Sequence, residues 1–293
     1  MDTLELKAYA KINLGLDVVR RLENGYHEVK MVMQTVGIHD TLILKKQKQG
    51  ITVTTDSGEI PADENNLVYK VAKLLIETYD IKEGVRIHLE KRIPVAAGMA
   101  GGSTDAAAVF KGMNALFALG LSTEELQRQA VKLGADIPYC ILGGTALAEG
   151  IGEKLTVLPD APDCFLLVAK PDINVSTKYV YENLNLPGLK KHPDIDGMVE
   201  AIYAGDEEGI ISRMDNVLQS VTETKYPVIS QLKVFMEENG ARKALMSGSG
   251  PTVFGIFESR AEAEAAAEKL ADKKIVKQIF VTTFQRKEIA DAG

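Results

Sequence analysis

The stretch PVAAGMAGGSTD, residues 94–105, decides how the rest of this sequence is interpreted. Three glycines and three alanines precede Ser103, and the alanine-rich run after it predicts a helix over about 104–118. Small residues let a backbone approach a ligand closely, and a helix start offers unpaired N–H groups and the positive end of its dipole. The stretch therefore predicts an anion site suited to a di- or triphosphate, with Ser103 or Thr104 donating to phosphate or reaching a Mg²⁺. An ordinary capped helix after a turn is the alternative.

Three other phosphate-binding patterns are missing from the 293 residues. No G-x-x-x-x-G-K-[ST] occurs, which excludes a P-loop. No H-R-D and D-F-G set occurs, which excludes a protein kinase. No G-x-G-x-x-G opens a β-α-β unit, which argues against a dinucleotide-binding oxidoreductase.

The part before the glycine-rich stretch is predicted to be mainly β-structure. Residues 4–18 alternate between apolar and polar side chains, which is typical of a strand. Lys11 and Asn13 share the polar face, which we interpret as solvated. Asn24-Gly25 marks a turn. Strands are predicted over 29–36, 40–47, 50–55 and 85–90, and a helix over about 65–79 with an apolar stripe of Leu67, Val68, Val71, Ala72, Leu74 and Leu75.

A domain boundary is predicted around residues 155–165, where prolines occur and periodicity is weak, giving domains 1–158 and 159–293. The order of elements after it predicts an α+β layer with an antiparallel sheet. The SGSGP loop at 247–251 either approaches phosphates or substrate or is only a flexible hairpin turn, and we favour the turn. Here strands are predicted over 165–169, 243–247, 252–257 and 276–284, and helices over about 195–235 and 259–272.

Composition narrows the class of protein. The net charge of −7 argues against a general nucleic-acid-binding surface. The two cysteines, Cys140 and Cys164, form no CxxC pair and support neither a zinc site nor a disulfide framework. The N-terminus lacks a signal-peptide pattern, and no apolar run reaches the length of a membrane span. We expect a soluble cytoplasmic protein with no membrane partner.

Two further segments carry candidate chemistry. Asp136 lies in the apolar stretch GADIP, just past a predicted helix end. A partly desolvated carboxylate there can act as a base, although a turn residue bonded to backbone N–H groups is the commoner role. Tyr26 and His27, in GYHE, can stack on and hydrogen-bond a planar ring. Taken alone, GYHE is a turn flanked by packed side chains.

Five segments occur in an order that resembles the GHMP kinase superfamily: AKINL from residue 10, GYH from 25, the loop 94–104, GADIP from 134 and GSG from 248. The match spans nearly the whole chain, and AKINL together with GYH is its more specific part. The resemblance implies that Lys11 and Asp136 are the catalytic pair. It implies substrate contacts from Asn13, Tyr26, His27 and Thr177, with Tyr26 and His27 holding a cytosine. The residues implied to bind ATP are Pro94, Val95, Ala96, Ala97, Gly98, Met99, Ala100, Gly101, Gly102, Ser103, Thr104, Asn66, Leu67 and Lys91.

The resemblance also implies an α+β fold in two domains, the first similar to domain 2 of ribosomal protein S5 and the second ferredoxin-like. The implied reaction uses ATP and Mg²⁺ to phosphorylate the 2-hydroxyl of a small molecule, 4-diphosphocytidyl-2-C-methyl-D-erythritol, on the non-mevalonate route to isopentenyl diphosphate. A monomer or weak homodimer is expected. Two alternatives stay open: a kinase of this superfamily for another alcohol, such as mevalonate or homoserine, and a non-catalytic nucleotide-binding regulator.

Many members of the superfamily have glycine where this chain has Ala96 and Ala97, and serine where it has Thr104. Alanine is still small and threonine keeps the hydroxyl, so the departures concern the fine geometry of the loop rather than the activity.

Overall fold

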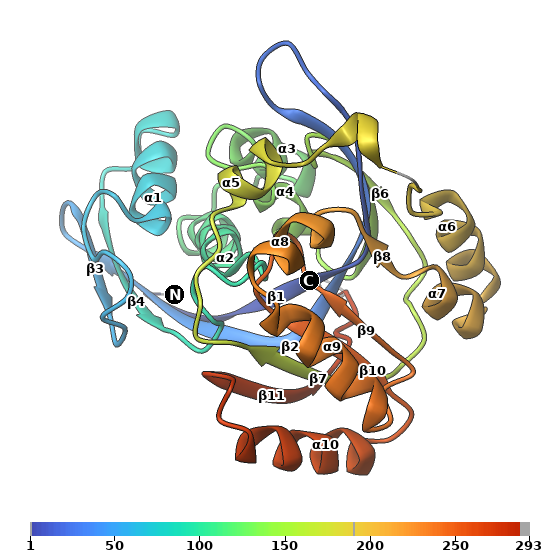
Figure 1. Cartoon of the computed structure of the whole chain (residues 1–293). Coiled ribbons are helices and arrows are strands. Elements are labelled where there is room, and N and C mark those ends of the chain that lie inside the picture. Colours follow the sequence, from blue (N-terminus) through green and yellow to red (C-terminus); the bar gives the residue numbers. More distant parts are fainter. Residues whose placement is uncertain (1, 190, 288–293) are drawn as a thin grey trace. The chain divides into compact units, whose positions relative to one another are not determined.

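The computed structural model describes residues 2–189 and 191–287 (Figure 1). Its strands are β1 Thr3–Arg21, β2 His27–Gln47, β3 Ile51–Thr55, β4 Gly84–Glu90, β5 Thr145–Gly150, β6 Lys154–Val157, β7 Phe165–Lys170, β8 Asp215–Asn216, β9 Lys243–Met246, β10 Val253–Phe257 and β11 Gln278–Thr283. Its α-helices are α1 Leu67–Thr78, α2 Gly101–Leu116, α3 Thr123–Ala130, α4 Ile137–Leu142, α5 Thr177–Glu182, α6 Ile195–Ala204, α7 Glu207–Arg213, α8 Gln219–Lys225, α9 Val228–Glu238 and α10 Arg260–Asp272, with a 3₁₀ turn at Leu186–Gly188. In this part of the chain, no helix is long and apolar enough to cross a membrane.

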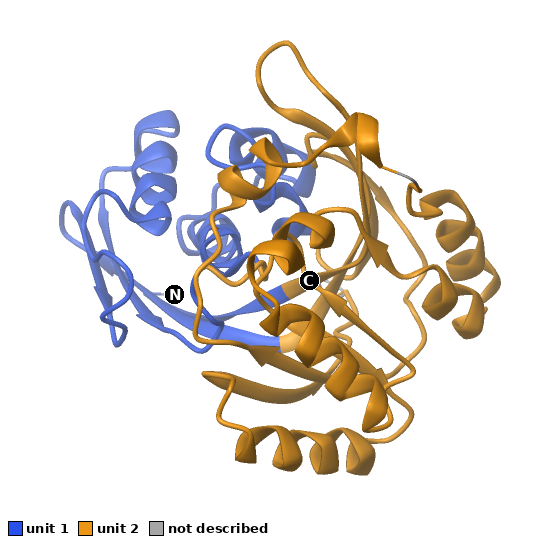
Figure 2. Cartoon of the chain, viewed as in Figure 1, with its two compact units in different colours: residues 1–10, 38–95, 100–142 blue, residues 11–37, 96–99, 143–293 orange. Residues whose placement is uncertain are grey.

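The chain forms two compact units that are not consecutive in sequence (Figure 2). Unit 1 consists of residues 1–10, 38–95 and 100–142, and unit 2 of residues 11–37, 96–99 and 143–293. Strands β1 and β2 each pass from one unit into the other, and so does the glycine-rich stretch. The last change from unit 1 to unit 2 falls between residues 142 and 143. The domain boundary predicted between residues 158 and 159 stays a prediction.

Unit 1 is a sheet covered by helices. Its part of β2 pairs antiparallel with β4, from Thr41 opposite Glu90 to Gln47 opposite Gly84, and β3 pairs parallel with β4. The helix α2 packs against α1, α3 and α4. Its alanines and Val109, Phe110 and Met113 are buried, which makes it the central helix of the unit.

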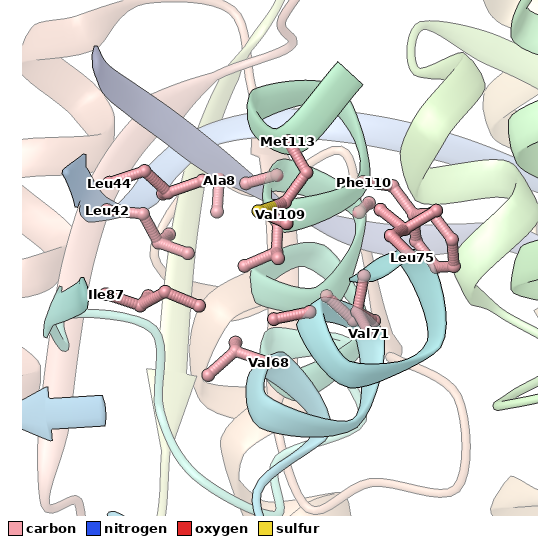
Figure 3. Close-up of a cluster of buried hydrophobic side chains, with 14 of the residues drawn as sticks. Ala8, Leu42, Leu44, Val68, Val71, Leu75, Ile87, Val109, Phe110 and Met113 are labelled. Carbon is pink, nitrogen blue, oxygen red and sulfur yellow. The ribbon is translucent and has the colours of Figure 1, made fainter. Parts of the chain in front are cut away.

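The core of unit 1 lies between this sheet and α1 and α2 (Figure 3). The expected stripe on α1 is confirmed, because Val68, Val71, Ala72 and Leu75 are buried and Leu67 and Leu74 are partly buried. Burying apolar side chains of this size stabilises a fold by about 1.5–3 kcal/mol each. The core thus fixes where both helices begin.

Unit 2 contains a second, antiparallel sheet in the order β11-β7-β10-β9. The helices α9 and α10 pack on it. The α+β class and the antiparallel sheet expected for the second half are therefore confirmed. Elsewhere in unit 2, β5 pairs with β2 and β6, and the short β8 pairs parallel with β1 at Gly15 and Leu16.

Two expectations for the first strands were wrong. The predicted strands 29–36 and 40–47 are one strand, β2, which continues through Gly37. From Lys11 to Asp17 the polar face of β1 is not solvated: Lys11, Asn13 and Asp17 are buried. Helix α6 covers this face within unit 2, since a Cβ on Gly15 would lie 2.6 Å from Cδ1 of Ile195. Alternation shows a strand but does not show what covers its polar side.

Candidate active site

The glycine-rich loop has a strained backbone between Pro94 and α2. Ala96, Gly98 and Ala100 have positive φ angles of 51°, 74° and 58°. For alanine this left-handed conformation costs roughly 1–2 kcal/mol, so surrounding contacts must hold the loop in shape. Ala100 is the N-cap of α2, and no side chain caps that end. The first N–H groups of α2 therefore keep the anion-binding character that the sequence predicted.

Two hydroxyls at this helix start differ in their use. Thr104 is buried, and its Oγ1 donates to the carbonyl of Gly101 at 2.9 Å. Ser103 is half-buried. Of the two hydroxyls proposed to donate to phosphate, Ser103 is thus the more accessible, and Thr104 stabilises the first turn.

The middle of the glycine-rich loop, residues 96–99, packs against the second glycine loop within unit 2. The Ser247 hydroxyl donates to the carbonyl of Gly98 at 3.0 Å, and a Cβ on Gly98 would lie 2.2 Å from the Ser247 carbonyl oxygen. Asn216 Nδ2 donates to the carbonyls of Met246 and Gly248, both at 2.8 Å. The 247–251 loop is a hairpin between β9 and β10, but it packs on the glycine-rich loop, so interpreting it as a turn alone was incomplete.

Helix α1 begins beside α2 within unit 1. The side chain of Asn66 caps α1 by accepting from the Val68 N–H at 3.0 Å, and its Nδ2 donates to the Pro61 carbonyl. A Cβ on Gly102 would lie 3.7 Å from Cδ1 of Leu67. Asn66 and Leu67 thus lie next to the start of α2, and the Asn66 amide is occupied by the helix cap.

Lys91 also lies beside the start of α2. Its Nζ would be 3.7 Å from a Cβ on Gly101. The ammonium forms ion pairs with Asp40 and Asp105, each at 2.5 Å. Neither Asp40 nor Asp105 was expected from the sequence to be a site residue. The signal available in the sequence was only that Asp105 follows Thr104 directly.

Lys11 and Asn13 are adjacent on the buried face of β1 in unit 2. Lys11 Nζ donates to Asn13 Oδ1 at 2.9 Å, and Asn13 Nδ2 contacts Sδ of Met31 at 3.2 Å. The backbone N–H of Lys11 donates to the carbonyl of Met99 at 3.2 Å. The amide thus holds the lysine side chain, and the strand is tied to the glycine-rich loop.

Asp136 lies in unit 1, directly before α4, and is half-buried. Its carbonyl accepts from the N–H of Cys140 in the first turn of that helix. Ile137, Pro138 and Tyr139, which follow it, are buried. The carboxylate is thus followed directly by buried side chains, and its role as a base stays a prediction.

The residues expected to hold a planar ring lie at the turn between β1 and β2. Tyr26 is 59% exposed, and Gly25 before it has a φ of 85° that closes the turn. The ring of His27 lies 5.1 Å from the ring of Tyr181, tilted by 39°. Burial, and then the charge of Arg21, lower the pKa of His27, so the imidazole is neutral near pH 7. A neutral imidazole both donates and accepts hydrogen bonds.

Tyr181 was missed by the sequence interpretation because it lies in α5, far along the chain from His27. The same helix begins with Thr177, whose Oγ1 is 2.9 Å from Oγ of Ser249. Helix α5 therefore connects the His27 ring with the second glycine loop, and all of these residues belong to unit 2.

Comparison with known proteins identifies the family. The model of the GHMP kinases N terminal domain matches residues 66–144, and that of the GHMP kinases C terminal domain matches residues 198–276. A 4-diphosphocytidyl-2-C-methyl-D-erythritol kinase from Lachnospira eligens is 54% identical over 283 residues, covering 96% of this chain and 98% of the relative. The chain belongs to the GHMP kinases. Their family activity is ATP-dependent phosphotransfer to a small molecule.

Solved structures of GHMP kinases agree with this assignment. A crystal structure of 4-(cytidine 5'-diphospho)-2C-methyl-D-erythritol kinase matches with a TM-score of 0.82 and 33% identity, covering 96% of this chain and 99% of that one. Homoserine kinase from Cytophaga hutchinsonii matches with a TM-score of 0.79 and 21% identity, covering 98% and 96%. The second match shows the shared two-domain GHMP kinase fold alone.

Proposed function

We propose that this chain transfers the γ-phosphoryl group of ATP to the 2-hydroxyl of 4-diphosphocytidyl-2-C-methyl-D-erythritol. The products are ADP and the 2-phosphate, on the non-mevalonate route to isopentenyl diphosphate. The observation that carries this proposal is the 54% identity, over nearly both whole chains, with a relative of that name. The match to a solved structure of the same kinase supports it.

In the proposed mechanism, the substrate oxygen attacks the γ-phosphorus while the bond to the bridging oxygen of ADP breaks. Asp136 accepts the hydroxyl proton, and the apolar neighbours Ile137 and Pro138 limit its solvation. Lys11 favours the ionised carboxylate and orients the hydroxyl. The hydrogen bond from Lys11 to Asn13 fixes the ammonium in one direction. The Lys11–Asp136 pairing is part of the proposal.

The glycine-rich loop supplies the phosphate site of the proposal. The N–H groups of Gly101 and Gly102 and the hydroxyl of Ser103 bind phosphate oxygens at the positive end of α2. In residues 2–189 and 191–287, no three His, Cys, Asp or Glu side chains gather as metal ligands. Mg²⁺ does not need such a cluster, because it is commonly bound by substrate phosphates, water and only one or two carboxylates. Bound there, it offsets charge on the transferred group.

The proposed cytosine site consists of Tyr26, His27 and Tyr181. The exposed ring of Tyr26 offers a stacking surface, and Tyr181 packs against the imidazole of His27. The neutral His27 ring reads the hydrogen-bonding edge of the base. Asn13 and Thr177 contact the rest of the substrate. Mevalonate and homoserine carry no base, so these aromatic residues argue against the alternative of another alcohol.

The test is an assay of ADP release with the cytidine substrate, mevalonate and homoserine in parallel. We expect turnover with the first alone. Asp136→Asn should lower kcat by about 10²–10⁴-fold, because a general base contributes that much, and should leave ATP binding intact. Asp80→Asn is the control, because Asp80 is an exposed surface residue that pairs with Lys82. Turnover within threefold of wild type for Asp136→Asn, or preference for another alcohol, would contradict the proposal.

The cytoplasmic location and the monomeric or weakly dimeric state stay predictions.

A further inference from the structure

Three charged side chains of unit 1 form a buried group, called here the Lys91 cluster: Asp40, Lys91 and Asp105. Nζ of Lys91 lies 2.5 Å from Oδ2 of Asp40 and 2.5 Å from Oδ2 of Asp105. The side chains are 0%, 6% and 4% exposed, in the same order. Charged side chains are rarely buried so completely unless they are paired, and the desolvation of such a group offsets much of the attraction. Stability alone is therefore a weak reason for this cluster.

The Lys91 cluster connects three segments that meet at the start of α2. Asp40 belongs to β2, and its Oδ1 accepts from the backbone N–H groups of Arg92 and Ile93 at 2.5 and 2.8 Å. Lys91 follows β4 and lies beneath Gly101, the first residue of α2. Asp105 is in the second turn of α2. The cluster thus fixes the first turn of α2 against the strand ends.

The cluster contains one ammonium and two carboxylates, so it carries an excess negative charge unless one carboxylate holds a proton. Burial, and then the charge of Asp40, raise the pKa of Asp105 to about 7 against the opposing attraction of Lys91. Attraction to Asp105 and Asp40 outweighs burial and raises the pKa of Lys91, which stays charged. Among the described residues, Oδ1 of Asp105 has no hydrogen-bond partner.

In the described part of the chain, two other titratable side chains lie next to the cluster, Arg92 and His39, and both have partners outside it. The guanidinium of Arg92 points to Asp56, with Nη1 2.9 Å from Oδ2. The ring of His39, next to Asp40 on β2, packs against Tyr9. The helices packed on α2 bury aliphatic side chains there, together with the phenol of Tyr139, while the thiol of Cys140 is half-buried.

We propose that Asp105 is a positioning residue for nucleotide binding, which holds Lys91 beneath the first turn of α2 and takes up a proton when phosphates bind at that turn. The inference rests on the proposed function, because it places the phosphates of ATP at residues 101–103. Phosphates there bring negative charge to within about two turns of Asp105, and like charges favour the protonated carboxyl. Taking up one proton from solvent makes the cluster neutral.

Electrostatics gives the size of the rise in the Asp105 pKa when phosphates bind. A charge about 7 Å away raises a pKa by on the order of one unit when the medium screens as a protein surface does. If the pKa of Asp105 rises from about 7 to about 8 on binding, ATP binds about fivefold more weakly at pH 8 than at pH 6. About half a proton is taken up per ATP near pH 7.5.

The experiment is calorimetric titration of the whole protein with MgATP at pH 6 to 8.5, in two buffers of different ionisation enthalpy. Wild type is compared with Asp105→Asn, which resembles the protonated carboxyl. Titration of ATP itself is common to both proteins, so the difference between them reports Asp105. We expect the ratio of the wild-type Kd to the Asp105→Asn Kd to rise about fivefold from pH 6 to pH 8, and the extra proton uptake to disappear in the variant.

Asp56→Asn is the matched control. Asp56 accepts from the backbone N–H of Lys91 at 2.8 Å and pairs with Arg92, but hydrogen bonds from Lys91 and Arg92 lower its pKa. It should keep the wild-type pH profile. If the ratio of the wild-type Kd to the Asp105→Asn Kd does not change with pH, Asp105 has a structural role only and the inference is overturned. The proposed function would still stand in that case, provided that the wild-type protein binds ATP. If Asp105→Asn does not fold, Asp40→Asn replaces it and should move the proton uptake to lower pH. An unchanged profile would again overturn the inference.

Discussion

Replacing Gly98 with alanine tests whether the two glycine loops need close backbone approach. A Cβ at this position would lie 2.2 Å from the carbonyl oxygen of Ser247 and 3.1 Å from that of Gly250. Carbon and carbonyl oxygen rarely come closer than about 3.3 Å. The added methyl group must therefore push the two loops apart by about 1 Å, which would change the position of residues 96–99.

Gly50→Ala is the matched control for this prediction. Gly50 has a φ of 77°, close to the 74° of Gly98, but a Cβ there would meet nothing within 4 Å. Its cost is only that of the left-handed conformation, roughly 1–2 kcal/mol. Gly98→Ala carries the same cost plus about 1–3 kcal/mol for overpacking.

The measurements are urea unfolding and MgATP titration of both variants. We expect Gly98→Ala to lower the free energy of unfolding by about 2–5 kcal/mol. It should also weaken ATP binding by about tenfold or more, because a shift of 1 Å disturbs a positioned site strongly. Gly50→Ala should bind ATP as wild type does. Equal losses of stability in the two variants, with wild-type ATP affinity in both, would refute the close-approach argument.

Three further predictions concern other parts of the site. Gly101→Val should weaken ATP binding in calorimetry while the melting curve shows a folded protein. Its Cβ would lie 3.1 Å from Cγ2 of Ile93 and 3.7 Å from Nζ of Lys91, so the valine must displace the first turn of α2, where the phosphates are proposed to bind. Unchanged affinity would place the phosphates elsewhere. Tyr26→Ala and His27→Ala should each raise the KM for the cytidine substrate by roughly ten- to a hundredfold, with the KM for ATP little changed. His27→Ala should also reduce discrimination against a uridine analogue. Wild-type KM values in both variants would rule out the cytosine site. The raised pKa of Asp105 means that the folded protein keeps a proton that the unfolded chain releases above about pH 4. The free energy of unfolding should therefore fall as the pH rises from about 4 to about 7, by at most about 4 kcal/mol. Asp105→Asn should remove this pH dependence in urea titrations.

The sequence was most informative where one segment carries the whole signal. The stripe on α1 and the antiparallel sheet of unit 2 follow from local spacing and are confirmed. The loop at 94–104 was recognisable because its small residues are contiguous. The positive φ angles at Ala96 and Ala100 could not be predicted, because alanine, unlike glycine, rarely adopts a left-handed conformation.

Residues brought together from distant segments could not be predicted in the same way. Tyr181 meets His27 across more than 150 positions of sequence, and nothing in the α5 sequence indicates that contact. The polar face of β1 was interpreted as solvated because most such faces are. In the structure Asn13 accepts from Lys11, and Asp17 is 2.8 Å from the His192 ring. A buried polar face needs hydrogen-bond or ion-pair partners, and the sequence does not show which residues they are.

Buried charge gives an independent way to find functional residues in this chain. Among the described residues, the charged side chains classed as buried are few: Lys11, Asp17, Asp40, Asp105 and Lys170. Because burying a charge is unfavourable unless it is paired, each of them needs a reason to persist. For Lys11 the proposed catalytic role supplies one. Asp40 and Asp105 were not named as site residues from the sequence, yet they enclose Lys91 beneath the turn where the phosphates are proposed to bind. An apolar cluster of the same volume would hold that turn as well, but it could not change its charge when a polyanion arrives, and this difference is what the pH dependence of ATP binding measures.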